Sequence, residues 1–332
     1  MPLAADVTSP VFSWNLVADF QDMWSYAFMV NAFRAGLVVS VVCAVVGWFM
    51  VLRRQTFAGH TLSVAAFPGA SLAVLAGFST SLGYFGFCVA AALVIAALGR
   101  KGQEGGAEES AVTGTVQAFA LACGFLFISL YKGLLEGPTA LLFGSFLGIT
   151  TNQVTVLAVV GAVVLAVLAV IGRPLLFASV DPQVAAGRGV PVRLLGTLFL
   201  VLLGAATAEA SQITGTLLVF ALMVIPAATA GQLTARPGRS LLLSVLLGLG
   251  VCWAGLIAAY YQPYPLGFFV TTFAFGGYLL AYLLRLVREA LGRSRERGQG
   301  QGQGPGPGQH GQGQGQGQHG HGAAAFTLGG AA

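Results

Sequence analysis

The sequence predicts an all-α protein that crosses a membrane several times. Of its 332 residues, 56% are hydrophobic and only 8% are charged, and the mean hydropathy is +0.81. A soluble domain carries about 25% charged residues, so this chain lacks the polar surface that a globular protein needs. Its apolar runs are continuous and about 20 residues long, which is the length of a spanning helix, whereas a spanning strand would show about 10 alternating residues.

Nine apolar segments are candidates for spanning helices, although several are short or interrupted by polar residues. Eight spanning helices and one half-length piece fit the pattern nearly as well, so we expect eight to nine helices. The segment from Glu136 to Gln153 is too short and too rich in Gly and Pro to span. The nine candidate spans are residues 29–52, 61–78, 81–99, 113–131, 153–172, 194–210, 213–232, 240–260 and 266–285.

Basic residues predict how these helices are oriented. Of the sixteen Lys and Arg residues, all except Arg34 and Lys132 lie in alternate connections or after the last span. Cytoplasmic loops carry the excess of Lys and Arg, so we expect these connections and the C-terminus to be cytoplasmic. The net charge of +5 then reflects topology and predicts no nucleic-acid partner. The cytoplasmic connections are residues 53–60, 100–112, 173–193 and 233–239.

Composition divides the chain into three regions. Residues 1–27 combine acidic residues with tryptophan and predict an outer-face segment, and residues 28–290 form the transmembrane domain. Residues 298–332 are rich in Gly and Gln, and such a composition predicts a disordered tail. The tail contains three histidines, which either bind a metal ion weakly or have no role: His310, His319 and His321.

No motif in the sequence indicates an enzyme. The only lysines are Lys101 and Lys132, and neither is followed by Ser or Thr, so there is no GxxxxGK[ST] phosphate-binding loop. The motifs HExxH, GxSxG and CxxC are also absent from the sequence. A chain of this kind would need an external source of energy to pump a solute.

Two ionisable residues in the apolar segments are candidates for a translocation path, since such groups at membrane depth are usually functional. Glu209 lies near the outer end of one span, and His60 starts another at the inner face, followed by the polar Thr61 and Ser63. Each has a plainer alternative. Glu209 is a solvated loop residue if its span ends by Thr207, and His60 is an interfacial cap.

Proline and glycine interrupt the same segments. Pro226 lies in the middle of a span, where its missing N–H predicts a kink, and small residues that suit close helix packing follow it. We therefore include Pro226 among the candidates for the path. Pro68 and Gly69 predict a break near the middle of the second span, and Gly59 predicts a tight turn before it.

Three blocks of sequence carry a family resemblance. They are LRR, FAGHTL and PG within residues 52–69, DPQVAAGRGVPV at 181–192, and TGTLLVFALMVIPAATAGQLTARP at 214–237. In this order they resemble the permeases of ABC importers for zinc, manganese and iron, over about residues 28–285. The chain departs from that family at Val64, where many members carry His, and at His60, where Asp is frequent.

The resemblance implies a type II ABC importer permease that works as a homodimer in the plasma membrane. Two cytoplasmic ATP-binding subunits would drive it, and an extracytoplasmic solute-binding protein would deliver its cargo. It also implies that residues 178–192 contact the ATPase. There Asp181 is expected to cap a short helix that begins at Pro182, and the segment ends around Arg188 and Gly189.

The cargo implied by the resemblance is a divalent metal ion, Zn²⁺ or Mn²⁺ before iron, with no permanently bound cofactor. His60 and Glu209 are the candidate metal ligands, since imidazole suits Zn²⁺ and carboxylate oxygen favours Mn²⁺. Two other hypotheses remain at this point. One is a proton-coupled secondary transporter with Glu209 as the relay, and the other is a membrane scaffold that transports nothing.

Overall fold

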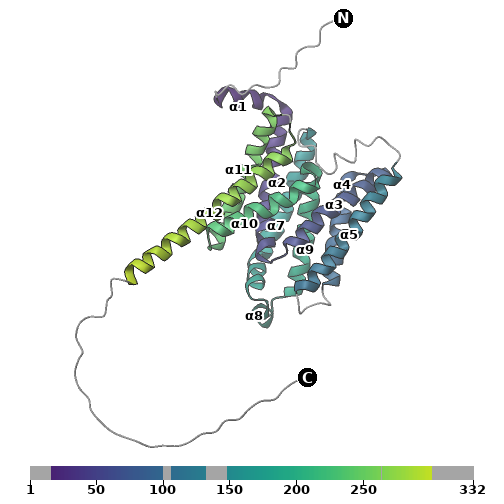
Figure 1. Cartoon of the computed structure of the whole chain (residues 1–332). Helices are drawn as coiled ribbons and strands as arrows, with labels where there is room; N and C mark the ends of the chain where they lie inside the picture. The colour runs from purple at the N-terminus through teal and green to yellow at the C-terminus, as the bar shows by residue number, and fades with distance from the viewer. Residues whose placement is uncertain (1–15, 100–105, 132–147, 263, 301–332) are drawn as a thin grey trace, which may run out of the picture. The chain divides into compact units, whose positions relative to one another are not determined.

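The computed structural model describes residues 16–99, 106–131, 148–262 and 264–300, and every regular element in those ranges is a helix (Figure 1). The chain separates into two compact units, Met1–Leu286 and Val287–Ala332, and the first contains the helix bundle. The helices are α1 (Leu16–Ser25), α2 (Ala27–Leu52), α3 (Thr56–Ala76), α4 (Thr80–Leu98), α5 (Gly106–Leu130), α7 (Thr151–Val180), α8 (Pro182–Gly187), α9 (Val192–Thr214), α10 (Thr216–Leu233), α11 (Pro237–Tyr261) and α12 (Leu266–Gly300).

Eight of these helices are long and apolar enough to cross a membrane, namely α2, α3, α4, α5, α7, α9, α11 and α12. The remaining candidate span, residues 213–232, corresponds to α10, which has a shorter apolar stretch, Leu218–Leu233. The expectation of eight to nine helices is confirmed, in the form of eight long helices and one shorter piece. Most of residues 136–153 lie outside the described residues, as do residues 1–15 and 301–332.

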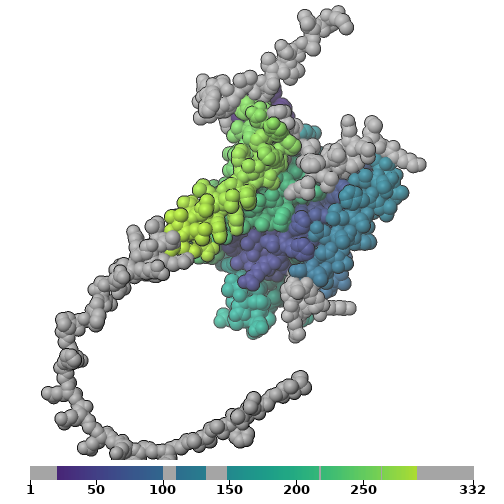
Figure 2. All heavy atoms as spheres, in the orientation of Figure 1, coloured from purple at the N-terminus to yellow at the C-terminus, as the bar shows by residue number. Residues whose placement is uncertain are grey.

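Helix α2 lies at the centre of the bundle, because it packs against α7, α9, α10 and α11. Helix α3 packs against α4 and α5, and α4 extends this layer to α9. In the space-filling view, the blue α5 forms one flank beside α3 and α4 (Figure 2). The apolar windows of α2 and α9 are 67% buried, against 17% for α5 and α12. The exposed apolar faces of α5 and α12 are therefore available to lipid or to another subunit.

The turn between α2 and α3 lies at Arg53–Gln55 and does not depend on Gly59. Arg54 adopts a left-handed conformation with φ 57°. Gly59 lies inside α3, where its missing Cβ leaves room for the sulfur of Met50 on α2. The predicted turn at Gly59 is therefore wrong, because the chain has already reversed at Arg53–Gln55 and Gly59 lies within α3.

Helix α3 continues through Pro68, so the predicted break at Pro68 and Gly69 is also wrong. Gly69 instead lies against Gly83 of α4: a Cβ on either glycine would collide with the carbonyl oxygen of the other. This reciprocal contact brings the two helix backbones together, as small residues do in membrane helix pairs. The Pro-Gly pair therefore serves helix packing within a continuous helix.

Helix α10 begins inside the protein. Gly215 joins it to α9 with φ 74° and ψ 160°, a conformation that is essentially restricted to glycine. The flanking Thr214 and Thr216 are both buried. Helix α10 then continues through Pro226, and the Thr229 hydroxyl donates to the Ile225 carbonyl at 2.7 Å. The kink that the sequence predicts at this proline stays a prediction.

Candidate functional site

His60 lies in the first turns of α3 and is half-buried. Its ring meets the ring of Phe220 on α10 edge-on, with centroids 4.9 Å apart. The Nδ1 atom is buried and has no hydrogen-bond partner among the described residues. His60 is therefore a side chain in contact with a second helix, with one ring nitrogen unused, and the alternative of an interfacial cap stays open.

Thr61 and Ser63 are both buried, and both use their hydroxyl hydrogens within the protein. Thr61 donates to Oε1 of Gln117 on α5 at 3.0 Å, which ties the two helices together. Ser63 donates to the carbonyl of His60 in its own helix at 2.7 Å. A direct role for these hydroxyls in the path stays a prediction, and their evident role is to stabilise α3.

Glu209 is buried inside α9, with 2% of its surface exposed. Its helix continues to Thr214, so the alternative that Glu209 belongs to a solvated loop after Thr207 is wrong. Neither carboxyl oxygen has a hydrogen-bond partner in the described part of the chain. The carboxyl group fits against Gly161 of α7, where an added Cβ would lie 2.9 Å from Oε1.

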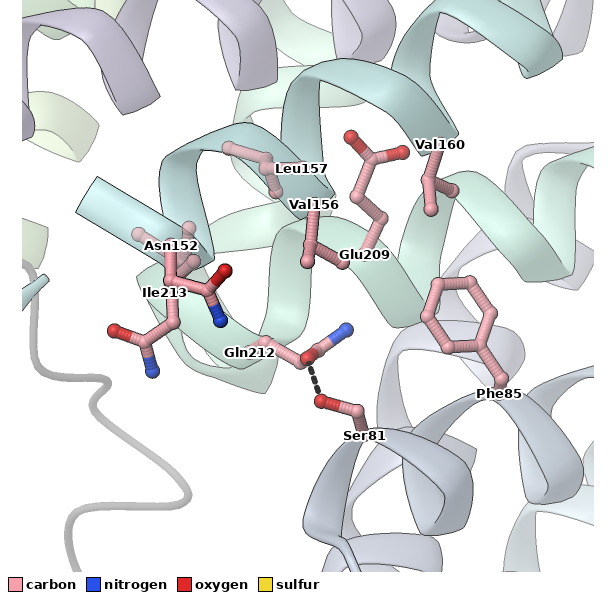
Figure 3. A pocket seen from close by; sticks show the side chains of 10 residues that line it. Ser81, Phe85, Asn152, Val156, Leu157, Val160, Glu209, Gln212 and Ile213 are labelled. Atoms are coloured by element: carbon pink, nitrogen blue, oxygen red, sulfur yellow. Dashed lines mark hydrogen bonds between the residues drawn. The ribbon is translucent and has the colours of Figure 1, made fainter. Parts of the chain in front are cut away.

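A cavity of about 140 Å³ adjoins Glu209 between α4, α7 and α9. Figure 3 shows its walls, with the Glu209 carboxyl group near the α7 residues Leu157 and Val160. The Ser81 hydroxyl donates to Oε1 of Gln212 at 2.6 Å across one side of it. His60 is not among the residues that line this cavity, so the structure places the two candidate metal ligands at different positions.

No group of three or more His, Cys, Asp or Glu side chains that could hold a metal ion occurs in residues that the structure describes. The histidines of the C-terminal tail lie outside those residues. A tight metal site is thus not evident in the bundle, and joint coordination by His60 and Glu209 stays a prediction. A weak site with one charged ligand is compatible with a transport path, because a cargo must also leave.

Pro226 is buried at the contact of three helices. Its ring lies against Gly248 of α11, where a Cβ would be 3.7 Å from Cγ of Pro226 and 3.5 Å from Cβ of Ala44 on α2. The proline therefore faces the interior of the bundle next to α2 and α11. Its place in a translocation path stays a prediction.

The predicted short helix between two spans is present as α8. Asp181 is its N-cap, since its carboxylate accepts a hydrogen bond from the Val184 N–H at 2.9 Å, and Pro182 occupies the first turn. Gly189 follows the helix with φ 81°, the conformation that commonly ends a helix. Val184 is exposed but Ala185 is fully buried, so α8 offers a smaller apolar surface than the sequence suggests.

Arg53 makes contacts that sequence reasoning missed, because it interpreted this residue only as an orientation signal. Its Nη1 donates to the Ser179 hydroxyl at the end of α7 at 3.2 Å, and its Nε donates to Gln55 at 3.2 Å. Its guanidinium group lies 5.5 Å from the ring centroid of Phe199 on α9. Arg53 therefore joins the ends of α2 and α7 to α9, beside α8.

The sequence matches the ABC 3 transport family over residues 25–285. The manganese transport system membrane protein MntC of Halalkalibacterium halodurans is 30% identical over 242 residues, which are 73% of this chain and 82% of the relative. The chelated iron transport system membrane protein YfeC of Yersinia pestis is 29% identical, over 75% of this chain and 83% of the relative. The solved structure of PsaBC from Streptococcus pneumoniae in complex with Fab has a TM-score of 0.71 and 26% identity, and covers 80% of this chain and 95% of that chain.

The family match begins just before α2 and ends within α12, so it includes the whole bundle, α8 and the turn between α9 and α10. A transport component of this family is not itself catalytic, which agrees with the lack of a phosphate-binding loop in the sequence. On the extent of this match, the chain belongs to the ABC 3 transport family.

Proposed function

We propose that this chain is the membrane-spanning permease subunit of an ABC importer that carries Mn²⁺ into the cytoplasm. The observation that carries the proposal is the family match over residues 25–285, which coincides with a bundle of eight long apolar helices. The names of the similar proteins from Halalkalibacterium halodurans and Yersinia pestis support a metal cargo. Manganese is preferred to zinc because a manganese transport protein is among these relatives and the buried ligand, Glu209, is a carboxylate.

The proposed assembly contains two copies of this chain, two cytoplasmic ATP-binding subunits and an extracytoplasmic solute-binding protein. In it, α8 contacts the ATP-binding subunit, and the C-terminus lies in the cytoplasm. The supporting observation is the short, capped and largely exposed α8 between two long helices. A rigid element at this position would transmit closure of the ATPase subunits to α7 and α9, against which α8 packs.

The transport test uses the chain co-purified with its ATP-binding subunit and reconstituted into liposomes with the solute-binding protein. We expect uptake of Mn²⁺ that requires ATP hydrolysis, and weaker uptake of Zn²⁺ and Fe²⁺ assayed in parallel. Uptake that persists without the ATP-binding subunit and stops when the proton gradient is dissipated would contradict the proposal. That result would favour the proton-coupled transporter with Glu209 as relay.

The double substitution Asp181→Ala with Arg188→Ala is expected to weaken binding of the ATP-binding subunit at least about tenfold. It removes the cap of α8, worth about 1 kcal/mol, and an exposed cation at its end. Co-purification and ATP turnover measure the effect. The matched control is Thr150→Ala, which removes the N-cap of α7 at the end of that helix far from α8. Equal association of both variants would contradict a role of α8 in coupling.

A further inference from the structure

We propose that the cavity beside Glu209 is a binding subsite for a partly hydrated hard divalent cation such as Mn²⁺, separate from His60. The inference rests on the proposed function, since it assigns a position to the cargo of the importer. It uses three observations: a buried carboxyl group without a partner, a cavity large enough for an ion with water, and walls whose polar atoms are oxygens and amides.

A carboxylate at this position needs either a counter-cation or a proton. Glu209 is 2% exposed, neither of its oxygens accepts a hydrogen bond from a described residue, and no basic side chain lines the cavity. Removing a carboxylate from water costs several kcal/mol unless a nearby opposite charge offsets this desolvation penalty. Gly161 makes room for the carboxyl group, since even a single added carbon there would lie 2.9 Å from Oε1. The helices thus accommodate an acid that they do not neutralise.

The size of the cavity favours a hydrated metal ion over a proton alone. A proton on Glu209 would need no space, whereas the cavity measures about 140 Å³. Since a water molecule takes about 30 Å³ of liquid volume, this space holds roughly four to five ligands of that size. An ion that keeps several waters and takes one carboxylate from the protein fits such a space.

The walls also favour a hard cation. The polar residues around Glu209 are Ser81, Asn152, Gln153 and Gln212, and none of the ten lining residues is His, Cys or Met. Oxygen ligands suit Mn²⁺, while Zn²⁺ and Fe²⁺ gain more from imidazole or sulfur. His60 lies elsewhere, against Phe220, and would offer a nitrogen ligand at a different position. The two positions would therefore act in succession and not as one site.

The place of the cavity agrees with entry from the outer face. Ser81 lies at the start of α4, and Asn152 and Gln153 lie in the first turn of α7. The sequence predicts both helix starts at the extracytoplasmic side. Asn152 is exposed and Gln212 is half-buried, whereas Glu209 is fully buried, so polar side chains extend from the surface to the carboxyl group. A cation released by the solute-binding protein would meet these groups first.

Mn²⁺ binding to the complex of this chain with its ATP-binding subunit, without nucleotide, tests the proposal. Electron paramagnetic resonance measures the loss of the free Mn²⁺ signal on titration. Glu209→Gln keeps the shape of the side chain and removes its charge, and should weaken binding at least about tenfold, the loss seen when groups that support a metal are removed. Asp22→Asn is the matched control, because it neutralises an exposed carboxylate that contacts Tyr260 and leaves an oxygen to accept that bond.

Unchanged Mn²⁺ binding in Glu209→Gln overturns the proposal, as does an equal loss in Asp22→Asn. If Glu209→Gln does not give a monodisperse complex, Mn²⁺ binding is measured instead in the double variant Ser81→Ala with Asn152→Ala. Both side chains lie at the rim of the cavity. A severalfold loss in that variant supports the subsite, and unaltered binding overturns it.

Uptake by the wild-type complex, measured in the same preparation, separates this inference from the proposed function. Wild-type Mn²⁺ binding that depends on Glu209, without ATP-driven uptake, would refute the function and leave the subsite standing. ATP-driven uptake that Glu209→Gln leaves unchanged would refute the subsite and leave the function standing.

Discussion

Replacement of Gly47 by alanine is expected to prevent α2 and α10 from packing together and to reduce the yield of folded permease severalfold. A Cβ on Gly47 would collide with the carbonyl oxygen of Met223 and would lie 2.9 Å from the Met223 Cα. These are main-chain atoms, so no side chain can move aside and the two helices must separate. Overpacking costs about 1–3 kcal/mol, which exceeds the roughly 1 kcal/mol that alanine gains over glycine in a helix.

Fluorescence-detected size exclusion after stepwise heating measures this effect. The matched controls are Gly86→Ala in α4 and Gly250→Ala in α11, where an added Cβ meets no atom within 4 Å. These variants make the same chemical change in helix interiors and should be as stable as the wild type or slightly more stable. A Gly47→Ala protein that melts together with these two controls would contradict the packing argument.

The consequence of the collision reaches beyond stability because α10 is the helix that contacts His60. Phe220 of α10 holds the His60 ring, and Thr207 of α9 contacts the Met223 sulfur at 3.9 Å. Moving α10 away from α2 would therefore shift the contact with one candidate ligand, whereas no residue of α10 lines the Glu209 cavity, which α4, α7 and α9 form. Any Gly47→Ala protein that still folds should keep Mn²⁺ binding at the Glu209 subsite.

Features that depend on local chemistry could be predicted from the sequence. Continuous apolar runs predicted the long helices because the lipid interior leaves a backbone few alternatives. The α8 helix followed from Asp181 and Pro182, since capping and the fixed φ of proline act over a single turn. In each case the residues that decide the structure are neighbours in the chain.

Features that depend on a partner helix could not be predicted in this way. Gly59 and Gly69 appeared to be chain breakers, but both lie inside α3 and contact another helix, Gly69 at the backbone of Gly83. The polar run after Thr207 suggested a loop, yet α9 continues to Thr214, whose hydroxyl donates back to the Ala210 carbonyl at 2.9 Å. Polar side chains that donate hydrogen bonds to carbonyl groups of their own helix do not end that helix. Hydropathy alone does not distinguish such residues from those of a loop.

The candidate site shows the same limit. Glu209 and His60 both stand out in the sequence as ionisable residues in apolar segments, but their separation depends on how α4 and α7 pack around α9. Ser81 and Asn152 carry no signal of their own in the sequence, because a Ser or Asn at a helix start is the normal capping choice. Only the folded bundle places them around the same cavity as the carboxyl group.

The conservative substitution Arg53→Lys is expected to uncouple ATP hydrolysis from transport while the protein folds and inserts normally. Lysine keeps the positive charge at the end of α2, so the orientation signal is preserved. It cannot, however, donate to Ser179 and Gln55 from one planar group that also lies on the Phe199 ring. The link between the ends of α2, α7 and α9 is then lost, although the net charge is unchanged.

This link matters because Ser179 lies two residues before Asp181, the cap of α8. If α8 receives the movement of the ATP-binding subunit, Arg53 is the side chain that passes it to α2, the central helix of the bundle. Coupling between two sites is typically worth about 1–3 kcal/mol, or a factor of 5 to 150. We therefore expect Mn²⁺ transported per ATP hydrolysed to fall about tenfold in Arg53→Lys, with ATP turnover near the wild-type rate.

Arg54→Lys provides the control, because it makes the same replacement of a guanidinium group by an ammonium group at the adjacent residue. Arg54 is exposed and does not make the contacts described for Arg53. Transport per ATP should remain at the wild-type ratio in that variant. If α8 passes its movement to α7 and α9 alone, transport per ATP should not differ between the two variants, since α8 packs against both helices without Arg53. Equal ratios in Arg53→Lys and Arg54→Lys would therefore show that the movement bypasses α2, whereas a selective fall in Arg53→Lys shows that the arginine carries it to the centre of the bundle.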